Sequence, residues 1–191
     1  MQDQSEHPPT RADARRNRER LVQAARAAFA AHGPEAPLDG IARRAGLGSG
    51  TLYRHFPTRD ALMRAVYWDE IEVLCARARE SWDATSPGDA LVAWLRLLAA
   101  RTGREGLAAA LMASMPDVSS RFIEDCHAAI EDAAGPLLRR AQDAGAVRPD
   151  LTLRELLELT HAITSGTRPD QVERRLSLLL DGIRVTDPPA R

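Results

Sequence analysis

Residues 38–56 have the sequence LDGIARRAGLGSGTLYRHF, and this stretch decides the fold of the first part of the chain. Its apolar residues predict two short amphipathic helices on either side of a tight turn at Gly46, because glycine readily adopts the backbone conformation that ends a helix. Leu52 and Phe56 are four residues apart, so both side chains point inward from the second helix. The stretch therefore has the pattern of a helix-turn-helix.

The other faces of the second helix carry side chains that are rich in hydrogen-bond donors. Small hydroxyl groups bond to base edges in the major groove, and arginine bonds to guanine in a bidentate fashion. Tyrosine, histidine and arginine also hold phosphates. An alternative role for Tyr53 and His55 is packing within the helical head, and both roles are compatible. The outward residues that predict DNA binding are Ser49, Thr51, Tyr53, Arg54 and His55.

The rest of the chain is also predicted to be helical. Apolar residues recur at helical spacing between glycines and prolines, and no sustained alternation typical of strands is present. We therefore expect an all-α fold of about nine helices. The expected helices cover about 14–32, 38–45, 49–56, 58–82, 87–101, 105–114, 116–144, 153–165 and 170–183.

Basic residues are concentrated in the first third of the chain. Residues 10–60 contain ten arginines against five acidic residues, whereas residues 69–191 contain fifteen arginines against twenty acidic residues. A basic head on a mildly acidic body is typical of a nucleic-acid-binding protein. The same excess also fits an ordinary solvated surface, so charge alone leaves both interpretations open.

Composition excludes several classes of protein. Cys75 and Cys126 are the only cysteines and form no CxxC motif, which excludes a cysteine zinc site and gives no sign of a disulfide framework. The longest apolar stretch, 106–115, is about half of what a membrane span needs, and the N-terminus lacks the features of a secretory signal. No nucleophile elbow, phosphate-binding loop, dinucleotide motif or zinc-protease motif is present. We therefore expect a cytoplasmic protein that is not an enzyme, with no cofactor, no metal and no membrane association.

The run from Gly50 to Leu62, GTLYRHFPTRDAL, resembles the TetR family of bacterial transcription regulators. The resemblance covers residues 21–66 and includes Ala45-Gly46-Leu47 at the turn. Beyond residue 66 the chain resembles the family only in its helical character and its length. The resemblance implies a homodimer that binds a palindromic operator in double-stranded DNA through its N-terminal helices. It also implies that an unknown small-molecule effector, bound in the C-terminal body, releases the protein from DNA, as in a repressor.

The expected domains follow from this comparison. We predict a disordered arm, a helix-turn-helix DNA-binding domain, a domain for ligand binding and dimerisation, and a loose tail. Their limits are 1–12, 13–58, 59–185 and 186–191.

The chain departs from the family pattern at Pro37 and Gly48. The family usually has hydroxyl residues at these places, where they cap helices and contact phosphate. Arginines near the turn and at the start of the next helix are expected to compensate. The complete set of expected DNA contacts is Arg43, Arg44, Gly48, Ser49, Gly50, Thr51, Tyr53, Arg54, His55, Thr58 and Arg59.

A group of soft and aromatic side chains in the body forms the candidate effector site. Methionine adapts to irregular shapes, and ligand pockets are mostly apolar with a few polar anchors. Each of these residues taken singly is also explained as ordinary core. The expected polar anchors are His127, Thr160 and His161. The full candidate set is Trp94, Met112, Met115, Phe122, Cys126, His127 and His161.

The last two helices are expected to pair with their symmetry mates in a four-helix bundle. The apolar stripe of the final helix would be exposed in a monomer, so a second copy is expected to cover it. The candidate interface residues are Leu156, Ile163, Val172, Leu176, Leu179, Leu180 and Ile183.

Two alternatives remain open at the level of sequence. Pro37 and Gly48 also fit a helical ligand-binding protein whose head no longer recognises specific DNA. Two Glu-x-x-His pairs, at 124–127 and 158–161, correspond to half of a di-metal carboxylate site in a helical bundle. Chance spacing is a sufficient account of these pairs and is favoured over the di-metal site, because the facing glutamates that would complete such a site are not evident.

Overall fold

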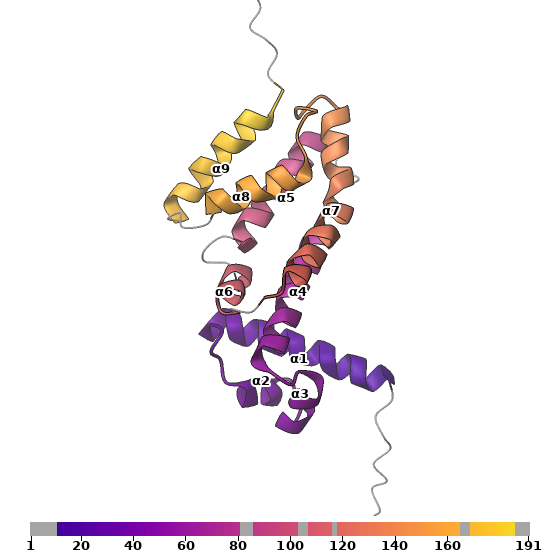
Figure 1. Ribbon diagram of the computed structural model, residues 1–191, viewed down its shortest axis with the longest axis vertical. Helices are drawn as coiled ribbons and strands as arrows, with labels where there is room; N and C mark the ends of the chain where they lie inside the picture. The colour runs from indigo at the N-terminus through magenta and orange to yellow at the C-terminus, as the bar shows by residue number, and fades with distance from the viewer. Residues whose placement is uncertain (1–10, 81–85, 103–106, 116–117, 165–168, 186–191) are drawn as a thin grey trace, which may run out of the picture. The chain divides into compact units, whose positions relative to one another are not determined.

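The computed structural model describes residues 11–80, 86–102, 107–115, 118–164 and 169–185. These residues form nine α-helices and no strand beyond an isolated bridge between Val147 and Arg184, which confirms the predicted all-α class (Figure 1). The chain divides into two compact units, Met1–Val66 and Tyr67–Arg191, whereas the expected domain limits stay predictions. Within the described ranges, no helix is long and apolar enough to span a membrane.

The first unit consists of three helices and the beginning of a fourth. They are α1 (Arg11–His32), α2 (Leu38–Arg44), α3 (Ser49–His55) and the first turns of α4 (Arg59–Glu80). α2 packs against both α1 and α3, so it lies at the centre of the unit. Leu52 and Phe56 are only 1% and 3% exposed, which confirms that both point inward as predicted. The other large buried side chains include Leu21, Phe29, Ile41 and Leu62.

The turn between α2 and α3 has a defined hydrogen-bond pattern. Gly46, with φ of 66°, donates its N–H to the carbonyl of Arg43 at 2.9 Å, and Leu47 donates to Ala42 at 2.9 Å. These two bonds form a Schellman motif, which ends a helix with a left-handed residue. A Cβ atom on Gly46 would lie 2.7 Å from Nη2 of Arg20. The left-handed backbone angle therefore favours glycine at this turn, and any other residue would also have to displace the end of the Arg20 side chain.

The second unit contains the remainder of α4 and five further helices. These are α5 (Pro87–Thr102), α6 (Leu107–Ala113), α7 (Ser120–Asp143), α8 (Leu153–Thr164) and α9 (Pro169–Ile183). α5 contacts α6, α7, α8 and α9, so it is the central helix of this unit (Figure 1). One apolar core joins buried side chains from α4, α5, α7, α8 and α9. This core fixes which faces of α7 and α8 point inward.

The helices of the structure agree with the predicted ones except for a few residues at their ends. α1 begins at Arg11, so Arg11 and Ala12, expected in a disordered arm, are helical. Asp13 in its first turn suits the positive end of the helix dipole. Residues 1–10 and 186–191 lie outside the described residues, as does Trp82, where the fourth helix is expected to end.

The chain's own core buries four of the residues that are expected at the dimer interface. α9 packs against α8 and α5 of the same chain, so the chain itself covers the apolar face of its last helix. Of the remaining candidates, Leu179 packs partly buried against the core, and Ile163 and Val172 are half-buried. The four candidates that belong to the chain's own core, each at most 3% exposed, are Leu156, Leu176, Leu180 and Ile183.

Candidate nucleic-acid interface and internal cavity

The outer face of α3 carries the side chains that are expected to contact DNA. Tyr53 is 48% exposed, an unusual position for a large aromatic side chain. The ring of His55 lies 6.4 Å from the ring of Phe56, so His55 also takes part in packing. α3 therefore has an apolar inner face and a polar outer face. The exposed residues are Gly50, Tyr53 and Arg54, and the half-buried ones are Ser49, Thr51 and His55.

A side-chain hydrogen bond links the start of α3 to α2, at a helix start that has no side-chain cap. Neither Gly48 before α3 nor Pro37 before α2 supplies a side-chain cap. Ser49 instead donates its hydroxyl to Oδ1 of Asp39 at 2.7 Å, which ties the start of α3 to α2. The Ser49 oxygen is thereby left as an acceptor toward a partner. The sequence pattern does not predict this role of Asp39, because only the folded turn brings Asp39 close to Ser49.

The arginines near the turn have different surroundings. Arg54 lies back along α3, where its Nε donates to the carbonyl of Gly50 at 3.2 Å and its Nη2 to Oγ1 of Thr51 at 3.3 Å. Arg43 and Arg44, at the end of α2, are exposed and have no ion-pair partner among the described residues. Their charges are therefore available to a phosphate backbone.

The residues that open α4 have structural roles. Thr58 accepts a hydrogen bond from the backbone N–H of Ala61 at 3.1 Å, which caps the start of this helix. Nη1 of Arg59 donates to the carbonyls of Pro34 at 2.7 Å and Ala36 at 2.8 Å. Arg59, expected beside a phosphate, thus holds the loop before α2. Any phosphate contact by Arg59 stays a prediction.

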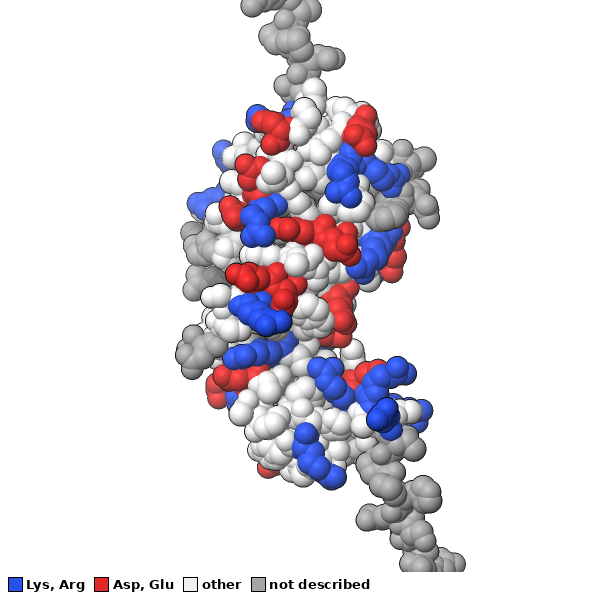
Figure 2. All heavy atoms as spheres, turned by 45° about the vertical axis from the view of Figure 1, so that its right-hand side comes forward, with Lys and Arg blue, Asp and Glu red and all other residues white. Residues whose placement is uncertain are grey.

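The two units differ in surface charge. In the view of Figure 2, the first unit, at the bottom, shows mostly arginine side chains in blue, whereas the second unit shows acidic and basic side chains interspersed. Arg18 lies over the ring of Phe56, 5.4 Å from its centroid, which places one more cation on the first unit. This distribution agrees with the basic head that the sequence indicates.

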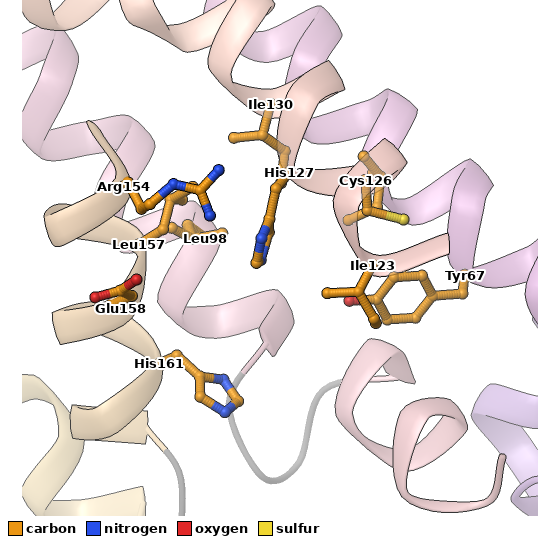
Figure 3. Close-up of a pocket in the computed structure, with 11 residues that line it drawn as sticks. Tyr67, Leu98, Ile123, Cys126, His127, Ile130, Arg154, Leu157, Glu158 and His161 are labelled. Carbon is orange, nitrogen blue, oxygen red and sulfur yellow. The ribbon is translucent and has the colours of Figure 1, made fainter. Parts of the chain in front are cut away.

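The second unit contains a cavity of about 180 Å³ between α4, α5, α7 and α8 (Figure 3). The residues from α7 and α8 each follow the spacing i, i+3, i+4, i+7, which places them on one face of each helix. The lining residues are Tyr67 and Ile71 on α4, Leu98 on α5, Ile123, Cys126, His127 and Ile130 on α7, and Arg154, Leu157, Glu158 and His161 on α8.

Three of the seven expected effector residues line this cavity, namely Cys126, His127 and His161. The other four lie elsewhere. Trp94 and Met115 are buried in the packing of the unit, and Trp94 donates its Nε1–H to the carbonyl of Leu74 at 3.0 Å. Phe122 packs against the ring of Tyr67 with the centroids 5.8 Å apart, and Met112 is half-buried away from the cavity. Thr160, an expected anchor, is fully buried outside the lining.

Most residues of the cavity wall were not predicted from the sequence. The helical spacing that relates His127 to Ile123 and Ile130, and His161 to Arg154 and Leu157, is present in the sequence and identifies these neighbours. No comparable signal marks Tyr67, Ile71 or Leu98, because nothing in the sequence shows that α4 and α5 complete the wall.

Burial raises the pKa of two groups on the cavity wall. Burial, together with the nearby Cys126, raises the pKa of Tyr67 to about 12. Burial and the charge of Asp125 raise the pKa of Cys126 to about 12 as well. Both side chains line the cavity, and each carries a proton on its oxygen or sulfur. Arg154 forms an ion pair with Glu131, with Nη2 and Oε1 2.9 Å apart.

The two Glu-x-x-His pairs do not converge. His127, Glu158 and His161 line the cavity, but Glu124 is exposed and does not. Among the described residues, no three His, Cys, Asp or Glu side chains are grouped closely enough to hold a metal ion. The arrangement therefore offers no observation in favour of the di-metal alternative.

Family models match both units of the chain. One that is described as bacterial regulatory proteins, tetR family, matches residues 21–66. Another, described as the C-terminal domain of SbtR-like transcriptional regulators, matches residues 86–185. The second match alone covers more than half of the chain.

Individual proteins agree with these matches. The HTH-type transcriptional regulator UidR of Escherichia coli K12 is 28% identical over 182 residues, which are 91% of this chain and 92% of that protein. The crystal structure of the TetR regulator SCO0520 from Streptomyces coelicolor is 34% identical, with a TM-score of 0.66 over 91% of this chain and 99% of that one. A TetR regulator from Mycobacterium vanbaalenii is 38% identical, with a TM-score of 0.68 over 92% and 99% of the two chains. The chain therefore belongs to the TetR family of helix-turn-helix transcriptional regulators.

Proposed function

We propose that the protein is a homodimeric repressor that binds a palindromic operator through α3 and leaves it when a small effector occupies the cavity of the second unit. The observation that carries the DNA-binding part is the outer face of α3, where Tyr53 and Arg54 are exposed. The exposed arginines at the end of α2, Arg43 and Arg44, add positive charge that no ion pair with a described residue offsets. A regulator of this kind acts where the DNA is, which in a bacterium is the cytoplasm. We assign it no catalytic role.

The geometry of the turn supports specific recognition of DNA. The Schellman motif at Gly46 and the Ser49–Asp39 hydrogen bond both fix α3 relative to α2. A recognition helix has to be held rigidly, because a bidentate arginine–guanine contact depends on precise placement. In a dimer, two such helices enter successive major grooves about 34–36 Å apart. The operator is therefore expected to be an inverted repeat.

The test is selection of bound duplexes from a random DNA pool at physiological salt, where non-specific phosphate binding is weak. We expect an enriched inverted repeat. Arg54→Ala should then weaken binding to that repeat by about 1–3 kcal/mol, or roughly 5- to 150-fold, and relax specificity at one base. Tyr53→Ala should weaken binding by loss of a backbone contact.

Arg139→Ala provides the matched control, because Arg139 is an exposed arginine on α7 in the second unit. It should leave DNA affinity unchanged. If folded wild-type protein enriches no repeat, or if neither Tyr53→Ala nor Arg54→Ala affects binding, the assignment of α3 as the recognition helix is wrong.

The cavity supports release by a ligand. It is largely apolar and has several polar groups, which is the usual character of a small-molecule site. RolR, which shares the fold at 19% identity and a TM-score of 0.61, is solved in complex with its ligand resorcinol. A ligand that favours the non-binding conformation a hundredfold shifts the equilibrium by about 2.7 kcal/mol, which is enough to relieve repression substantially.

A further inference from the structure

The polar groups that point into the cavity are mainly hydrogen-bond donors. The Tyr67 hydroxyl and the Cys126 thiol carry their protons at neutral pH, as these groups ordinarily do, and burial raises the pKa of each further, to about 12. Arg154 carries N–H groups in addition to the one directed at Glu131. In Figure 3 the guanidinium of Arg154 points toward His127, whereas the carboxylate of Glu158 points away from it. A ligand in this cavity therefore meets a wall that favours acceptor atoms.

Two polar side chains of the cavity wall have no hydrogen-bond partner among the described residues. The hydroxyl of Tyr67 and the ring of His127 form no hydrogen bond with any residue that the structure describes. Figure 3 shows His127 between Arg154 on one side and Tyr67 on the other. Both side chains are half-buried and line the cavity, so their polar atoms are available to the atoms of a ligand.

The volume of the cavity indicates the size of a group that would fill it. An engineered protein cavity of about 150 Å³ that is lined by aliphatic and aromatic side chains holds one benzene molecule. The volume here, about 180 Å³, is slightly larger. It therefore suits a single six-membered ring with one small substituent. The apolar side chains of Ile71, Leu98, Ile130 and Leu157 supply the surface on which such a ring packs.

We propose that the effector is a single-ring organic acid, whose carboxylate accepts hydrogen bonds from Arg154 and His127 while its ring packs among the apolar residues and Tyr67 donates from the opposite side. This inference rests on the proposed function, because it takes the cavity as the effector site. Glu131 forms an ion pair with Arg154 and offsets part of its attraction for an anion, so specificity comes from the combined donors of α4, α7 and α8.

Isothermal titration calorimetry of the full chain with benzoate and benzamide tests the charge requirement. The two probes have nearly the same shape, but only benzoate presents a carboxylate. We expect benzoate to bind about 10- to 150-fold more tightly, as is usual for a hydrogen bond to a charged group. Equal binding of the two probes, tighter binding of benzamide, or no binding of benzoate at millimolar concentration would each overturn the proposed ligand class.

Variants locate the carboxylate in the cavity. Arg154→Gln should abolish the preference for benzoate over benzamide, whereas Arg139→Gln, the same change at an exposed position of α7, should preserve it. Tyr67→Phe removes a single oxygen and keeps the ring that packs against Phe122, so it should stay folded and weaken benzoate binding several-fold. Unchanged benzoate affinity in folded Arg154→Gln or in Tyr67→Phe would show that the acid does not bind in this cavity.

A separate measurement distinguishes this inference from the proposed function. The selected operator duplex is titrated with protein in the presence and absence of saturating benzoate. Benzoate that binds without weakening the protein–operator complex contradicts the release mechanism and leaves the ligand class intact. Operator binding combined with no affinity for benzoate contradicts only the ligand class.

Discussion

Arg59 connects the first turn of α4 to the loop before α2. Its Nη1 donates to two carbonyls, those of Pro34 and Ala36, at 2.7 and 2.8 Å. Hydrogen bonds to a charged group each contribute about 1.5–3 kcal/mol. We predict that Arg59→Ala lowers the free energy of unfolding by about 2–3 kcal/mol, measured by urea denaturation. Unchanged stability with weaker operator binding would instead identify Arg59 mainly as a phosphate contact.

The buried thiol of Cys126 makes stability sensitive to alkaline pH. Burial raises its pKa from 9.0 in the free side chain to about 12 in the folded protein. The folded state therefore retains a proton that the unfolded state releases, so this contribution is complete below about pH 9 and is lost as pH rises toward 12. We predict that the free energy of unfolding falls over this range, and that it falls less steeply in Cys126→Ala. Parallel slopes for the two proteins would contradict this assignment.

The start of α8 is stabilised by hydrogen bonds between Thr152 and Glu155, at the first turn of the helix. The backbone N–H of Thr152 donates to Oε2 of Glu155 at 2.8 Å, and the N–H of Glu155 donates to Oγ1 of Thr152 at 3.2 Å. These reciprocal bonds form a capping box, which lowers the pKa of Glu155 below its ordinary value. We predict that Thr152→Ala lowers the free energy of unfolding by about 1 kcal/mol, measured by thermal denaturation. Ser119→Ala at the start of α7 should have a comparable effect, because its hydroxyl accepts from Phe122.

The individual helices could be predicted from the sequence, whereas the contacts between helices could not. Helical periodicity and punctuation by glycine and proline identify each helix, and the spacing of Leu52 and Phe56 correctly predicts the inner face of α3. The same information does not say which helix covers a given face. For this reason the sequence identifies His127 and His161 as candidate cavity residues but misses Tyr67, which reaches the cavity from α4.

At the scale of the whole molecule, the same limitation affects the dimer. The stripe that contains Leu176 and Leu180 predicts that α9 needs an apolar partner, and this requirement is correct. The sequence does not distinguish a partner in the same chain from one in a second copy. In the structure the partner is the chain's own core, where Leu176 is 1% exposed and Leu180 is 3% exposed. A dimer interface on these helices has to use their outward faces instead.

The outward faces of α8 and α9 do carry exposed leucines. Leu159 on α8 is 43% exposed and Leu178 on α9 is 63% exposed, and the two helices pack against each other. Exposed apolar side chains on adjacent helices are typical of an interface between subunits. We predict that Leu178→Glu converts a dimer into monomers, measured by sedimentation equilibrium at micromolar concentration. The unfolding of the monomer should change little, and the affinity for the inverted repeat should fall strongly. Leu176→Ala is the contrasting variant: it opens a cavity in the core, so it should cost about 2–5 kcal/mol of stability. A Leu178→Glu protein that remains dimeric would place the interface on another surface, because a buried glutamate at a subunit contact is too costly to be tolerated.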